Sequence, residues 1–171
     1  MANEATSTTV ETLARYLDEN SLQYELQLDE ERILLGIDGV PMIVRYRAEA
    51  AVLLITVPNV TRAPQEGHGA PTPEALNTFL RYLMDTNYKL MVGRFGWDHR
   101  DGEVIFEIAI LCTDAPVTRD QFMANLVLAV QTVEKRYQQL QRALWSGLSL
   151  EQLLQGDEEV RGPILPGTGR A

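Results

Sequence analysis

Hydrophobic residues recur at the helical spacing of three and four positions in three parts of the chain. The first part begins near Thr8, which has a capping-box spacing with Glu11, and ends by Ser21. The second begins at Thr72, a good N-cap followed by proline, and runs to residue 87. The third follows Thr118, and a short helix over 149–155 comes after it. Its apolar positions are Phe122, Leu126, Val130, Val133, Tyr137, Leu140 and Leu144.

Between these helices, apolar and polar residues alternate with the two-residue period of half-buried strands. The pattern predicts strands over 22–28, 33–37 and 42–46, with Asp38-Gly39 as a hairpin turn. A fourth strand is expected over 51–57 and should end before Pro58, although residues 47–54 taken alone could also form a helix. The last two strands are expected over 89–97 and 103–111, joined by a turn at 98–102.

This order of elements favours an α+β fold, an antiparallel sheet with helices packed on it, in the order α-β-β-β(-β)-α-β-β-α. The chain lacks the continued strand–helix alternation that is typical of a doubly wound parallel sheet. Residues 1–156 are expected to form one domain. Residues 157–171 are rich in glycine and proline and are interpreted as a tail, ordered only against a partner.

Composition narrows the class of ligand. The formal charge is 15 − 24 = −9, which disfavours nucleic acid and anionic membrane surfaces as main partners. The longest apolar run is about seven residues, too short to span a membrane. The N-terminus lacks the basic start and apolar core of a signal peptide. With one cysteine the chain has no internal disulfide, and we expect a soluble cytoplasmic protein.

The sequence offers few groups that could converge for catalysis. Asp98, His99 and Asp101 form the one cluster suited to a metal, but they sit in one tight turn, where neighbouring side chains splay outward. Cys112 ends an apolar strand, where a small buried side chain is the simpler interpretation. Residues 93–96, Gly-Arg-Phe-Gly, precede no helix that could bind phosphate. We therefore expect no enzymatic activity, no metal and no cofactor.

Aromatic residues have two interpretations. Trp97, Tyr137 and Trp145 could line a groove for a partner, or they could pack in the core, which we expect for at least two of the three. Arg94 and Phe95 lie beside Trp97 on a strand with glycines at 93 and 96. An arginine among aromatic residues on such a strand is the part of the sequence that we expect to contact a partner.

Residues 76–122, LNTFLRYLMDTNYKLMVGRFGWDHRDGEVIFEIAILCTDAPVTRDQF, resemble the YbjN-like family of small bacterial proteins labelled sensory transduction regulators. The shared features are the LN in the helix, the VGRFGWD strand, the Asp-Gly turn, the apolar return strand and the Thr-capped helix. The element order is also similar to that of type III secretion chaperones, over most of residues 7–145. The resemblance implies a non-enzymatic, often dimeric, acidic binding protein.

Together these observations predict a chaperone-like adaptor that binds a segment or tail of another protein and can form a homodimer. Main-chain pairing at a sheet edge would supply affinity, and apolar pockets would supply specificity. The side chains expected to contact the partner are Arg94, Phe95, Trp97, Tyr137 and Trp145. The alternative is a small-ligand sensor with a pocket near Gly93 and Gly96, where missing side chains leave room. An enzyme ranks third.

Overall fold

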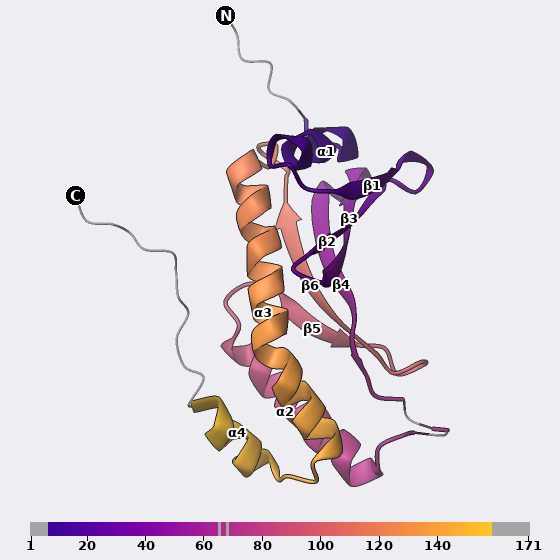
Figure 1. Cartoon of the computed structure of the whole chain (residues 1–171), viewed down its shortest axis with the longest axis vertical. Helices are drawn as coiled ribbons and strands as arrows, with labels where there is room; N and C mark the ends of the chain where they lie inside the picture. The colour runs from indigo at the N-terminus through magenta and orange to yellow at the C-terminus, as the bar shows by residue number, and fades with distance from the viewer. Residues whose placement is uncertain (1–6, 65, 68, 159–171) are drawn as a thin grey trace, which may run out of the picture.

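A computed structural model describes residues 7–64, 66–67 and 69–158 as one antiparallel sheet covered by helices (Figure 1). The six strands lie in the order β1-β2-β3-β4-β6-β5, and every neighbouring pair is antiparallel. The α+β fold expected from the sequence is confirmed. The helices are α1 (Val10–Glu19), α2 (Pro73–Lys89), α3 (Arg119–Trp145) and α4 (Leu150–Glu158). The strands are β1 (Tyr24–Gln27), β2 (Arg32–Ile37), β3 (Val40–Arg47), β4 (Val52–Arg62), β5 (Arg94–Trp97) and β6 (Glu103–Leu111).

The helices pack on one face of the sheet, and their apolar residues join those of the strands in a single core. α3 crosses β4 and β6, α2 lies beside α3, and α1 packs near β1 and β2 (Figure 1). Alternate strand residues such as Ile33, Val44, Ile55 and Phe106 are buried against these helices. The intervening residues form the opposite side, which no helix of the described residues covers. We call this side the helix-free face.

Capping residues explain where the helices begin. Thr72 accepts a hydrogen bond from Ala75 N–H, and the capping box expected at Thr118 is present. The prediction of a capping box between Thr8 and Glu11 is wrong. Thr9 caps α1 instead, accepting from Thr12 N–H at 3.2 Å. The Thr8 hydroxyl accepts a hydrogen bond from Val117 N–H at 2.9 Å, so a tertiary contact uses the first threonine of the pair.

β4 is longer than the sequence predicts, because Pro58 does not end it. The strand continues to Arg62 with a register shift between Val57 and Thr61. Within this irregular stretch Asn59 has a φ of 49°, and proline is tolerated there because no regular ladder bond is required of it. The helical alternative for 47–54 reduces to a single 3-10 turn at Ala48–Ala50.

β5 is shorter than predicted, since the segment 89–97 divides between two elements. α2 continues to Lys89, and the strand begins only at Arg94. Gly93, with a φ of 77°, supplies the change of direction before the strand. At the other end of the chain, α4 ends at Glu158 rather than at residue 155. The remainder of the predicted tail, 159–171, lies outside the described residues.

Across the described ranges, none of the helices combines the length and the apolar character that crossing a membrane requires.

Candidate functional site

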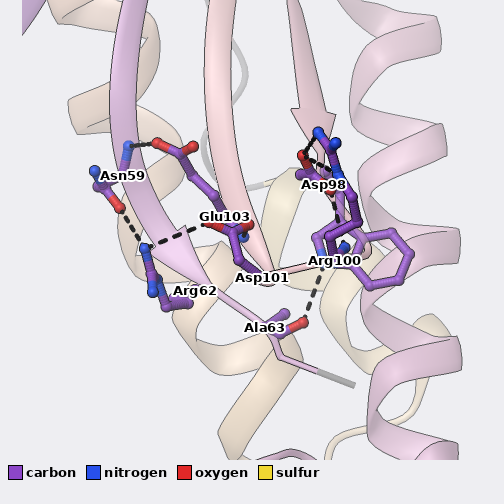
Figure 2. Close-up of polar contacts among 8 residues, drawn as sticks. Asn59, Arg62, Ala63, Asp98, Arg100, Asp101 and Glu103 are labelled. Atoms are coloured by element: carbon purple, nitrogen blue, oxygen red, sulfur yellow. Dashed lines mark hydrogen bonds and ion pairs between the residues drawn. The ribbon is translucent and has the colours of Figure 1, made fainter. Parts of the chain in front are cut away.

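The turn between β5 and β6 uses its polar groups to hold itself together. Figure 2 shows Asp98 accepting hydrogen bonds from the backbone N–H of Arg100 at 2.9 Å and from its guanidinium. The side-chain bond, followed by the backbone bond, holds the pKa of the Asp98 carboxyl well below its usual range. Asp101 accepts from Glu103 N–H at 3.0 Å. Within the described residues, no three His, Cys, Asp or Glu side chains come together as a metal site would need.

The same turn anchors the chain that leaves β4. Ala63 N–H donates to the carbonyl of Gly102 at 2.7 Å, and the Trp97 indole N–H donates to the carbonyl of Ala63 at 3.1 Å. Asn59 N–H donates to the Glu103 carboxylate at 3.1 Å (Figure 2). These contacts give the aspartates, Glu103 and Trp97 structural roles.

The space beside Gly93 is already occupied, whereas a hollow lies next to Gly96. A Cβ on Gly93 would lie 2.9 Å from Cε2 of Phe106, so this ring fills the room that the glycine leaves. The hollow has a volume of about 470 Å³ and is open to solvent. It is lined by Gly96, Trp97, Asp98, His99, Arg100, Glu103 and Ile105.

The two central candidates, Arg94 and Phe95, point to opposite faces of the sheet. Arg94 is exposed and forms an ion pair of 2.9 Å with Glu107 on β6. Phe95 is 3% exposed and packs against Phe106 with 4.9 Å between ring centroids. The structure therefore places Phe95 in the core, where a partner cannot reach its side chain. Strand alternation explains the difference between the two neighbours.

The three remaining aromatic candidates do not come together. Trp97 is partly buried against the core, but Tyr137 is 46% exposed and Trp145 is 50% exposed. The expectation that core packing would account for at least two of them is wrong. Tyr137 and Trp145 are about 12 Å apart along α3 and point in different directions, because eight residues exceed two helical turns.

The strongest exposed feature was not among the sequence-based candidates. At the end of α2 and in the connection to β5, Met84, Tyr88, Met91 and Val92 are 72%, 90%, 91% and 44% exposed. We call these four residues the apolar corner. Figure 1 shows the end of α2 and its connection to β5 on the side of α3 away from β1–β3. The signal was the pair Met84 and Tyr88, four positions apart on the face of α2 opposite the buried Phe79.

The two edges of the sheet differ in what they offer a partner. At the β5 edge, the Asn87 side chain bonds both backbone groups of Phe95, accepting from its N–H at 2.7 Å and donating to its carbonyl at 2.8 Å. This carboxamide occupies the position that an added strand would take. At the other edge β1 pairs, among the described residues, only with β2.

Comparison with known proteins gave a family and a fold. The family model "YbjN: Putative bacterial sensory transduction regulator" matches residues 9–142. The crystal structure of YbjN from E. coli is similar with a TM-score of 0.60 and 14% identity, over 81% of this chain and 94% of that chain. A chain of the crystal structure of the ExsC–ExsE complex is similar with a TM-score of 0.52 and 21% identity, over 79% of this chain and 97% of that chain.

A third solved structure is the Yersinia pestis type III secretion chaperone SycH in complex with a stable fragment of YscM2. It gives a TM-score of 0.48 and 16% identity, over 74% of this chain and 98% of that chain. No curated protein sequence matches the chain. The likeness to YbjN and to the ExsC–ExsE chain is one of fold.

Proposed function

The chain belongs to the YbjN family, and from this premise we propose that it is a non-enzymatic, chaperone-like adaptor that binds an extended segment of another protein. One of the structures with this fold, ExsC–ExsE, is itself a complex of two proteins, which supports a protein partner. The β5–β6 turn supports the non-enzymatic part of the proposal, because hydrogen bonds within the turn already engage the carboxylates of Asp98 and Asp101.

The apolar corner is the observation that carries the proposal. Exposed apolar residues are normally scattered, whereas a contiguous group marks an interaction surface. Two of its four members are methionines, whose flexible side chains adapt to different partners. Arg94, two residues after Val92 and ion-paired with Glu107, adds a charged side chain at the start of β5. Tyr137 and Trp145 are further contacts on α3.

The two edges suggest how an extended segment binds. The partner pairs with the backbone of β1, because Asn87 blocks the β5 edge at Phe95. A segment that reaches from β1 to the apolar corner must cross the width of the sheet. Five strand intervals amount to about 24 Å, which roughly seven extended residues span.

A co-purification experiment tests the proposal. Tagged protein with Met84→Ser, Tyr88→Ser and Met91→Ser is compared with wild type in extract of the native cell, and bound proteins are identified by mass spectrometry. We expect a stoichiometric partner with wild type and its loss with the triple variant. The matched control is Val127→Ser, which removes an exposed apolar side chain elsewhere, on α3. Recovery of no protein partner, or equal recovery by the triple variant, overturns the proposal.

A second copy of the chain is the other protein that could cover the apolar corner, and light scattering separates the two cases. A homodimer has a mass of twice 19.2 kDa and returns to 19.2 kDa in the triple variant. A wild-type mass of 19.2 kDa leaves the corner free for a different protein.

Small-ligand sensing is the second candidate function, and the hollow beside Gly96 is the observation that favours it. A thermal-shift screen against metabolites tests it, because a ligand at 100 times its dissociation constant adds about 2.7 kcal/mol of stability. The absence of any hit among nucleotides, metals and common cofactors would count against this candidate.

A further inference from the structure

The helix-free face carries three arginines in one place, although the chain as a whole is acidic. Arg32 on β2 lies directly opposite Arg45 on β3, and Arg47 follows two residues later on the same face. All three face away from the helices, because the residues between them, such as Ile33 and Val44, are buried in the core. We call Arg32, Arg45 and Arg47 the arginine corner.

The arginine corner is only partly neutralised within the chain. Arg32 pairs with Glu30 at 2.9 Å. In the described part of the chain, neither Arg45 nor Arg47 has an ion-pair partner. The neighbours of Arg45 on this face are Ile43 and Arg47 along the strand and Arg32 and Leu54 across it, and none is a carboxylate.

This arrangement is unfavourable in the free protein. Like charges directly opposite each other destabilise a pair of strands. The net charge is −9, yet the four neighbours of Arg45 on this face are all apolar or basic. Such a site gains most from carboxylates that another molecule brings.

Apolar side chains lie beside the arginines on the next strands. Leu54 on β4 is opposite Arg45, and Val52 is opposite Arg47. Leu111 on β6 is opposite Val52 and is 74% exposed. Cations and apolar residues therefore adjoin across three neighbouring strands and the end of a fourth, and a ligand for this surface needs both anionic and apolar groups.

We infer that the arginine corner and its apolar neighbours bind a protein segment in which carboxylates accompany apolar residues. The inference rests on the proposed function and specifies the chemistry of the partner. Arg45 and Arg47 are two residues apart in one strand, about 6.7 Å. An extended segment has the same spacing between residues that point to one side, so acidic residues at positions i and i+2 reach both guanidiniums. A neighbouring leucine or valine then contacts Leu54, Val52 and Leu111.

Polyanions fit the same surface less well. Nucleic acid and anionic membranes present many charges over a wide area and would meet the rest of an acidic molecule. Nucleic acid also brings no aliphatic side chain to Leu111. A short segment with a few carboxylates satisfies the arginines without that repulsion.

The test uses labelled ten-residue peptides and fluorescence anisotropy on the full chain. One peptide carries glutamates at i and i+2 flanked by leucines, and a second replaces each glutamate by glutamine. We expect the acidic peptide to bind at least tenfold more tightly than the amide peptide, the loss that accompanies removal of a charge-assisted hydrogen bond. Raising the salt concentration from about 0.05 M to 0.5 M should weaken the binding of the acidic peptide and leave the binding of the amide peptide unchanged.

Variants locate the binding site. Arg45→Gln with Arg47→Gln should weaken the acidic peptide about tenfold or more. Arg15→Gln is the matched control, because Arg15 is an exposed arginine on α1. Equal binding of the two peptides, an equal effect of the control, or stronger Arg45-dependent binding of short duplex DNA or anionic vesicles overturns the inference.

The cellular partner separates this inference from the proposed function. If wild type recovers a partner that the Arg45→Gln, Arg47→Gln variant recovers equally, the inference fails and the adaptor function stands. If wild type recovers no partner at all, the adaptor function fails, whatever the peptides do. Loss of the partner in both the arginine variant and the apolar-corner variant supports both.

Discussion

At the scale of single residues, two glycines with positive φ illustrate how differently the fold depends on them. Gly39 has a φ of +82° at the tip of the β2–β3 hairpin, with nothing within 4 Å of an added Cβ. Gly102 has a φ of +76°, and its Cβ would lie 2.5 Å from the carbonyl carbon of Ala63. Both positions strain an ordinary residue, but only the second also collides with backbone.

Gly102→Ala should therefore destabilise the protein much more than Gly39→Ala. We expect Gly39→Ala to lower the free energy of unfolding by about 1 kcal/mol, the cost of the left-handed conformation alone. Gly102→Ala should cost more than about 3 kcal/mol, because the Ala63 backbone must also move and lose its bond to Gly102. Urea denaturation of both variants measures the difference. Similar losses in the free energy of unfolding for the two variants would show that the backbone at Ala63 can move away from residue 102 at little cost.

At the scale of elements, Asn87 joins a helix to the edge of a sheet. Its carboxamide lies near the end of α2 and satisfies both backbone groups of Phe95 in β5. An edge strand with unpaired backbone groups is open to pairing with other chains, and proteins commonly block such edges. Here the side chain of Asn87 blocks the free edge of a strand of only four residues.

Asn87→Ala should open this edge. We expect faster hydrogen exchange at the Phe95 amide and a loss of about 1–3 kcal/mol in the free energy of unfolding, because two buried backbone groups lose their partner. Asn77→Ala is the control, since Asn77 is exposed on the same helix and shares the same gain in helix propensity. Unchanged protection of Phe95 would contradict this role for Asn87.

Local signals were sufficient for elements whose boundaries depend on neighbours in sequence. The Thr118 capping box and the Asp38-Gly39 turn lie where the pattern predicts them. The turn even determines part of the arginine corner. A two-residue hairpin with Ile37 opposite Val40 necessarily brings Arg32 opposite Arg45.

Boundaries set by distant contacts could not be predicted. β4 passes through Pro58 because the neighbouring Asn59 N–H finds Glu103, 44 residues away. Sequence alone also could not show that Phe95 is buried or that Met84 and Tyr88 are exposed to solvent. Exposure of α2 depends on which of its faces meets α3, and both faces carry large apolar residues.

At the scale of the whole molecule, charge is distributed unevenly. The net charge is −9, while the arginine corner concentrates cations on one part of the helix-free face. The long-range field is therefore repulsive to anions, and the local field is attractive over a few ångströms only. Screening at physiological salt shortens the repulsion to about 8 Å.

Short duplex DNA and vesicles with anionic lipid should consequently show no measurable binding at about 0.15 M salt. Electrophoretic mobility shift and vesicle co-sedimentation are the measurements. Binding of either that disappears with Arg45→Gln would show that the local cations outweigh the net charge.

The bond between Thr8 and Val117 has an effect during synthesis of the chain. The Thr8 hydroxyl accepts from a backbone N–H 109 residues later, and the Tyr16 hydroxyl contacts the carbonyl of the same valine. A ribosome that adds about 5–20 residues per second needs roughly 5–20 s to cover that interval. α1 can meet β1 and β2 within this time, but its contacts with Val117 and α3 cannot form. The part of the apolar face of α1 that packs against α3 therefore stays in water until α3 begins to emerge.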